Sequence, residues 1–409
     1  MTFIGVDLIS FKALPSSHNV TNIRITNIPP GLHFLYTGTD ASLSIRHGRW
    51  LNFTATKPQW YVLRWNSDAE NLDLLDHDDP AAQEAIRSPS TRGLVDYAAL
   101  QDATSSLATK DSREAGDGST PPYEERRAES TDWPALTRHM SPTFLTRALS
   151  SDSHWVVSSV SSAPSDTECI PGLSHLEASD TLQQHPLNLL PINLKQTWAA
   201  GDIGRTRTDR ARDRSWYLSQ LIESVTPVNG DKAIGAKELL GELQFCFLMV
   251  LTLANYSCLE QWKRLLKVFL TCQNALREAE AYFVQVVKVL RLQVWHVEDV
   301  EGGLFEMRDE GGSAWLRALW GRFRDLVDEV FGDGNGEEKG AVAAAGQSLR
   351  REVDALQKLF EDRYGWQSER DILRRGLLEL EDGERVEVSM LGVDEDEETG
   401  EYAPVVVET

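Results

Sequence analysis

The sequence predicts an α+β multidomain protein with an N-terminal antiparallel, sandwich-like β-rich domain, a C-terminal all-α helical stack and an extended acidic tail. Three observations lead to this prediction. Short β-branched and aromatic runs fill the first 66 residues, as is typical of strands. An almost wholly apolar run at 245–254 lies within a long helical pattern. The C-terminal part of the chain is rich in acidic residues, with valines interspersed among them.

The β-rich domain is expected over 1–200. Two polar stretches within it, at 101–130 and 150–184, are predicted to be disordered insertions. Pro29-Pro30-Gly31 can form a tight turn before the apolar segment that follows it. Helical spacing returns at 133–149, between the insertions. Strands are predicted at 3–6, 23–25, 32–36, 50–53, 60–65 and 155–157, and a strand or extended segment at 187–194.

The helical domain is expected over 208–378 and is organised around one buried helix. The run 245–254 is apolar all round, so a helix formed by it must be buried on every side. It is also shorter than the ~20 residues that cross a bilayer. Glu238, Glu242 and Gln244 precede this run and favour a core helix of a soluble protein.

The rest of the helical domain follows from amphipathic spacing. The segment 255–257 separates the buried helix from an amphipathic one at 259–270, which is expected to fold back on it. Short connections between helices favour antiparallel neighbours. Other helices are predicted at 216–225, 283–294, 315–330 and 349–360.

Charge and cysteine usage limit the function classes. The 409 residues include 41 basic and 63 acidic ones, a net charge of −22, which disfavours nonspecific binding to nucleic acids or anionic membranes. A protein partner with a basic face is compatible with this charge. No CxxC pair is present, and reduced core thiols of an intracellular protein are preferred over disulfides or metal ligands. The four cysteines are Cys169, Cys246, Cys258 and Cys272.

No motif of a catalytic site is found, and we expect no enzyme activity, no cofactor and no metal. The glycine-rich segment 332–336 follows no predicted strand, so a phosphate loop is not expected. His33 is the one candidate base or ligand, as in a hydrolase. A hydrogen-bonded, partly buried histidine is preferred, because no second titratable group lies nearby in sequence. Similarly, Trp262 beside Lys263 and Arg264 could contact nucleic acid but fits better as a core residue with a solvated flank.

The acidic tail is expected over 379–409 and is predicted to bind a partner. Acidic residues keep a free tail soluble and extended, whereas 385–388 and 402–407 are β-prone. Such a segment can add a strand to an exposed sheet edge, where main-chain hydrogen bonds supply the affinity. The alternative is an unstructured terminus. The candidate partner-binding residues are Tyr402, Val405, Val406 and Val407.

Several stretches of the sequence resemble the AAR2 family of pre-mRNA splicing factors. They are GVDLISF at 5–11, IPPGLHFLY at 28–36, WYVLRW at 60–65, ELLGELQFCFLMVLTLANYSCLEQWKRLLKVF at 238–269 and RYGWQ at 363–367. The long block at 238–269 is the most specific of them. The loop lengths suggest a filamentous-fungal member.

The resemblance implies a noncatalytic assembly factor, or chaperone, of the U5 small nuclear ribonucleoprotein (snRNP) that occurs in cytoplasm and nucleus. Family members bind the RNase-H-like and MPN-like domains of the Prp8 scaffold and delay its engagement by the Brr2 helicase and RNA. Their C-terminal tail can pair as a strand between these domains, and 402–408 is the matching segment here. No direct contact with nucleic acid or membrane is implied.

The alternative class is a helical adaptor protein in a membrane-traffic complex. Short helical stacks can serve in that role. It would need a basic patch or an exposed groove for an acyl chain or peptide, and the sequence indicates neither.

Overall fold

The structure, a computed structural model, describes the greater part of the chain in two compact units. The first is drawn mainly from 1–191 and 224–263, and the second from 192–223, 264–298 and the residues after 302. The predicted domain limits stay predictions. The described residues are 2–13, 23–38, 45–56, 58–66, 71–87, 94–99, 132–151, 155–167, 186–297, 312–332, 346–366, 375–379 and 385–389.

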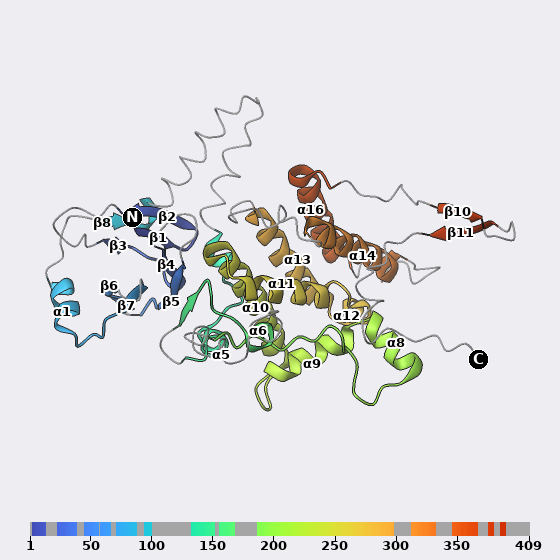
Figure 1. The fold of residues 1–409 in the computed structure, drawn as a ribbon, viewed down its shortest axis with the longest axis horizontal. Coiled ribbons are helices and arrows are strands. Elements are labelled where there is room, and N and C mark those ends of the chain that lie inside the picture. Colours follow the sequence, from blue (N-terminus) through green and yellow to red (C-terminus); the bar gives the residue numbers. More distant parts are fainter. Residues whose placement is uncertain are drawn as a thin grey trace, which may run out of the picture. The chain divides into compact units, whose positions relative to one another are not determined.

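A five-stranded antiparallel sheet is the framework of the first unit (Figure 1). Residues 32–34 and 36–38 of its central strand are buried, and consecutive buried residues mean that both faces of the strand are covered. The predicted antiparallel β-region is therefore confirmed. In sheet order the strands are β2 (Ile9–Ala13), β1 (Thr2–Val6), β4 (Gly31–Gly38), β5 (His47–Phe53) and β9 (Val156–Ser158).

Two-stranded pairs and short helices complete the β-rich part. The strand predicted at 60–65 forms only from Leu63, and the segment 187–194 contains no strand. The helix predicted at 133–149 is two helices, because the hydroxyl of Ser141 accepts a hydrogen bond from the amide of Phe144 and begins a second one. The elements are β3 (Arg24–Thr26) parallel to β8 (Leu94–Asp96), β6 (Leu63–Asn66) antiparallel to β7 (Asn71–Leu74), α1 (Pro80–Arg87), α4 (Trp133–Leu136), α5 (Pro142–Ala148) and α6 (Pro164–Thr167).

Helix α10 (Lys232–Leu253) supplies the core of the first unit. Every residue over 239–250 is buried, which confirms the predicted buried helix. Its Phe245 packs against Trp50 of β5 and Phe144 of α5, with ring centroids 6.2 and 5.6 Å apart. The polar residues expected to precede the core are in part inside it, since Glu242 and Gln244 are 0% and 1% exposed.

One asparagine forms the junction between α10 and α11 (Tyr256–Phe269). The side-chain oxygen of Asn255 accepts a hydrogen bond from the Cys258 amide at 2.8 Å, which caps the start of α11. Its side-chain nitrogen donates to the carbonyls of Ser158 and Ser161, beside β9. The predicted break at 255–257 is thus shorter than expected, because α11 already begins at Tyr256, and Asn255 fixes it to the end of the sheet.

The second unit is helical, which confirms the predicted helical region. The left-handed backbone of Gly365, at φ 63°, ends its last helix. Trp366 then turns back and stacks on Phe360, with ring centroids 4.5 Å apart. The unit holds the last part of α11 with α8 (Gly204–Arg212), α9 (Ser215–Val225, in its first nine residues), α12 (Gln273–Glu278), α13 (Glu280–Trp295), α14 (Gly312–Gly332) and α16 (Gln347–Tyr364).

Two antiparallel strands, β10 (Arg375–Glu379) and β11 (Arg385–Ser389), follow the helices. Strand β11 includes the β-prone fragment predicted at 385–388. The second β-prone fragment, at 402–407, lies outside the described residues.

Candidate functional site

The predicted partner-binding residues and the predicted catalytic candidate have different outcomes. Tyr402, Val405, Val406 and Val407 lie outside the described residues, so the tail site stays a prediction. His33 is described, and its side chain is 4% exposed. Its surroundings therefore test whether it can act as a base or ligand.

His33 pairs with Asp7, a second titratable group that sequence distance conceals. Pairing of β1 with β4 brings the two residues together. The His33 Nδ1 atom lies 2.6 Å from an Asp7 carboxylate oxygen, and the Tyr97 hydroxyl donates to that same oxygen at 2.5 Å. The other carboxylate oxygen accepts from the Phe34 amide at 2.8 Å. Asp7 is thus the centre of a buried network.

The geometry favours a structural role for His33 over a catalytic one. Its Nε2 atom lies 2.9 Å from the carbonyl oxygen of Pro29, so both ring nitrogens already have partners inside the protein. Asp7 occupies the two-residue turn between β1 and β2 at φ 58°, a conformation that favours glycine. Its hydrogen bonds offset that strain, which indicates that the pair fixes the fold of the sheet.

Replacing His33 by alanine is expected to destabilise the protein by ~1–3 kcal/mol, because the buried Asp7 carboxylate loses a hydrogen-bond partner. Denaturant unfolding measures this loss. His77→Ala removes an exposed histidine and serves as the matched control. An unchanged midpoint for His33→Ala, together with loss of a hydrolytic activity, would show that the role is catalytic.

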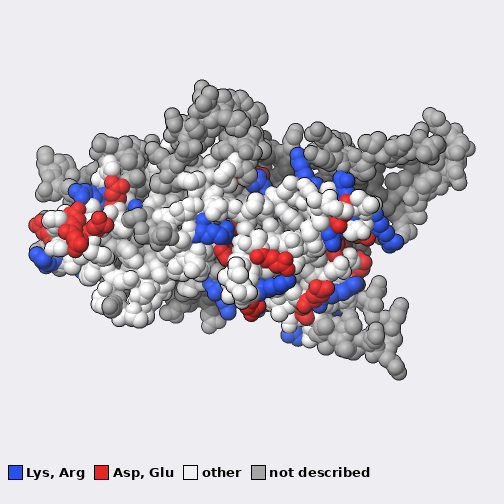
Figure 2. All heavy atoms as spheres, turned by 90° about the horizontal axis from the view of Figure 1, so that it is seen from below, with Lys and Arg blue, Asp and Glu red and all other residues white. Residues whose placement is uncertain are grey.

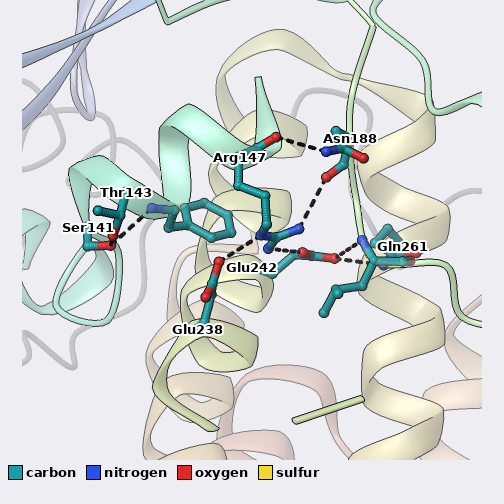
Figure 3. A network of polar contacts seen from close by, with 9 residues as sticks. Ser141, Thr143, Arg147, Asn188, Glu238, Glu242 and Gln261 are labelled. Atoms are coloured by element: carbon teal, nitrogen blue, oxygen red, sulfur yellow. Dashed lines mark hydrogen bonds and ion pairs between the residues drawn. The ribbon is translucent and has the colours of Figure 1, made fainter. Parts of the chain in front are cut away.

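A second buried network joins α5 to α10 and α11 (Figure 3). The guanidinium of Arg147 donates to Glu238 at 2.7 Å and to Glu242 at 2.8 Å. The other oxygen of Glu242 accepts from the Leu190 amide at 2.9 Å and from the Gln261 side chain at 2.8 Å. A fully buried carboxylate needs an opposite charge and hydrogen-bond donors. Arg147 supplies the charge for Glu242, and Leu190 and Gln261 supply further hydrogen bonds.

The Glu242 network explains two differences from the sequence interpretation. Gln261, a polar residue of the amphipathic helix predicted at 259–270, is 1% exposed because it bonds to Glu242 and to the Leu190 carbonyl. In the segment 187–194, expected to be a strand or extended, the Leu190 amide donates a hydrogen bond to the Glu242 carboxylate instead of to a neighbouring strand. The adjacent Trp262 is 1% exposed, in agreement with the preferred core interpretation.

The described residues offer few features typical of metal, membrane or nucleic-acid sites. Within these ranges no group of three metal-ligating side chains occurs, and no helix is long and apolar enough to cross a membrane. Basic and acidic side chains are interspersed on the face drawn in Figure 2.

Three of the four cysteines lie in the described residues and are buried free thiols: Cys246, Cys258 and Cys272. Burial raises the pKa of Cys272. Cys169 lies outside the described residues.

His139 is a further titratable group that sequence reasoning did not identify. Burial, followed by the positive charges of Arg138 and Lys237, lowers its pKa from 6.5 to about 4. Spacing alone gives no signal for it, because Arg138 is its neighbour but Lys237 is brought close by the fold.

The pKa of His139 predicts how stability depends on pH. Below pH 6.5 the unfolded chain takes up a proton on this residue, whereas the folded protein takes it up only near pH 4. The free energy of unfolding should therefore fall as the pH drops from 6.5 to 4. His139→Gln should reduce this fall, as measured by denaturant unfolding at several pH values. An identical pH profile for the variant would contradict the prediction.

Comparisons with known proteins cover both parts of the chain. The AAR2 N-terminal domain matches residues 1–150, and the AAR2 C-terminal repeat region matches 189–369. The AAR2 homologue of Mus musculus is 25% identical over 319 residues, which are 72% of this chain and 73% of that protein. The Caenorhabditis elegans homologue is 23% identical over 306 residues, or 70% and 74%. This chain, which contains the Asp7–His33 pair and the Glu242 network, therefore belongs to the AAR2 family.

Proposed function

We propose that this protein is a noncatalytic assembly factor of the U5 snRNP that acts as a chaperone of the Prp8 scaffold. Family membership carries the proposal, since it implies a U5 snRNP assembly role. The partners are the RNase-H-like and MPN-like domains of Prp8, and binding delays engagement of the helicase and RNA. Such a factor acts in both cytoplasm and nucleus.

The buried polar networks support a function based on binding. The ring nitrogens of His33 both have partners within the protein, and the Glu242 carboxylate is surrounded by internal donors. These groups stabilise the fold, and their geometry leaves no open nitrogen on His33 for a substrate. A stable platform that presents a separate binding segment fits this arrangement.

The tail is the proposed binding segment. Residues 379–409 contain twelve acidic residues and one basic residue, so like charges keep the free segment from collapsing. The valines at 405–407 suit a strand added to a partner's sheet edge, in which main-chain hydrogen bonds supply affinity and alternate side chains supply specificity.

Deleting 400–409 is expected to weaken binding to the two Prp8 domains without lowering the Tm of the protein. The reason is the lost main-chain pairing with the partner, since the two buried networks described above are formed by residues before 262. Calorimetric titration with the RNase-H-like and MPN-like fragments measures the affinity.

Deletion of ten residues at 110–119 is the matched control, since it shortens a polar segment of another region by the same length. Equal affinity of the tail deletion and the full chain would exclude the tail as the binding segment. Absence of binding by the full chain, in parallel with binding by another family member, would refute the proposed function as a whole.

A further inference from the structure

The turn between α4 and α5 lies directly on helix α10. A Cβ atom at Gly241 would be 2.8 Å from the carbonyl oxygen of His139, so only glycine allows this approach. Gln244, which is 1% exposed, accepts a hydrogen bond from the His139 amide and donates one to the Ala135 carbonyl, both at 2.8 Å. Gly241 and Gln244 of α10 therefore fix the position of the backbone of residues 135–139.

This contact places three basic side chains together. Lys237 precedes Gly241 by four residues, so both residues lie on the same face of α10. Lys237 is therefore one helical turn away from the contact between Gly241 and His139. The charges of both Arg138 and Lys237 act on His139, which is consistent with that placement. Arg138 and Lys237 are exposed, and His139 is half-buried between the turn and the helix.

The nearest carboxylate along α10 is already engaged. Glu238, next to Lys237 in sequence, accepts a hydrogen bond from Arg147 at 2.7 Å. Arg147 also pairs with Glu242, so its single positive charge is shared between two carboxylates. Arg138 and Lys237 add two positive charges near His139, on a chain of net charge −22.

We propose that Arg138, His139 and Lys237 form a binding site for the phosphate of a phosphorylated serine or threonine side chain in a partner protein. The guanidinium and ammonium groups supply charge-assisted hydrogen bonds. The imidazole supplies a third donor once it is protonated. The inference is independent of the proposed function, because it concerns residues other than those of the tail.

The chemistry of the cluster favours a phosphate monoester over other anions. A phosphorylated side chain carries a charge of about −1.5 to −2 near pH 7 and three acceptor oxygens, which match three basic groups better than a single carboxylate does. A nucleic acid would bring many further negative charges against an acidic protein. The exposed Ile234, one turn before Lys237, offers an apolar contact to the peptide beside the phosphate.

The titration of His139 provides a direct readout. Burial and two positive neighbours lower its pKa, and a bound anion favours the charged imidazole. Addition of N-acetyl-phosphoserine amide to the full chain should therefore raise the pKa of His139 from about 4 toward 6.5. Nuclear magnetic resonance of the imidazole proton follows the change, and the signal is assigned by its loss in His139→Gln.

The test compares three ligands and four variants. N-acetylserine amide and an oligouridylate at equal phosphate concentration replace the phosphoserine probe. Lys237→Gln and the double variant Arg138→Ala/Lys237→Ala should weaken phosphoserine binding at least tenfold, whereas Lys237→Arg should retain it. The double variant Arg351→Ala/Lys358→Ala removes two exposed charges of α16 and should bind normally.

A response to phosphoserine that depends on Lys237 and Arg138 supports the site. An equal response to the oligouridylate would overturn the assignment to a phosphorylated side chain. No response of His139, or a response that persists in Lys237→Gln, would overturn the site itself. None of these outcomes depends on binding to Prp8, so they are distinguishable from failure of the proposed function.

Discussion

Replacing Arg147 by alanine is expected to lower the free energy of unfolding by ~3–5 kcal/mol, the usual cost of removing one partner from a buried ion pair. Glu242 is 0% exposed, and its carboxylate receives the Arg147 guanidinium at 2.8 Å. Without that guanidinium the remaining donors are the neutral groups of Leu190 and Gln261. The charge would then be buried in a poorly compensated site, at the cost of stability.

The double variant Arg147→Met/Glu242→Met separates loss of the pair from loss of packing. It should be more stable than Arg147→Ala, because it removes the fully buried charge of Glu242 together with its partner. Arg205→Ala is the surface control, since its ion pair with Asp209 has side chains 94% and 66% exposed and should contribute little. Denaturant unfolding of all three variants gives the comparison. A loss for Arg147→Ala no greater than that for Arg205→Ala would show that Glu242 does not depend on this cation.

Local sequence patterns predicted the elements whose burial is set by their own residues. The run at 245–254 is buried as a helix because its apolar residues leave no polar face. The apolar-rich run 32–36 lies within β4, whose two faces are covered. Where short polar residues intervene, the prediction was less accurate. Ser141 begins a new helix by capping, so the continuous helical spacing at 133–149 concealed a turn.

The polar networks could not be predicted, because their partners lie far apart in sequence. Asp7 and His33 are 26 residues apart and share no local pattern, yet the β1–β4 pairing places them 2.6 Å apart. Glu242 precedes the predicted apolar run as a polar residue, and its burial is explained by its ion pair with Arg147. Sequence spacing reports neighbours on one element and gives no information about contacts between elements.

Replacing Phe247 by alanine is expected to cost ~3–5 kcal/mol, the range found when a buried aromatic side chain is removed from a core. Phe247 is 1% exposed in the middle of α10, and its ring centroid lies 6.3 Å from that of Trp262. The alanine variant leaves a cavity whose lining includes that tryptophan, since a close-packed interior collapses only in part. Phe247→Leu should cost less, because it fills more of the volume. Ile203→Ala, at a site 83% exposed, should leave the unfolding midpoint unchanged. If Phe247→Ala unfolds at the wild-type midpoint, α10 cannot be the buried centre on which the sheet and the polar networks depend.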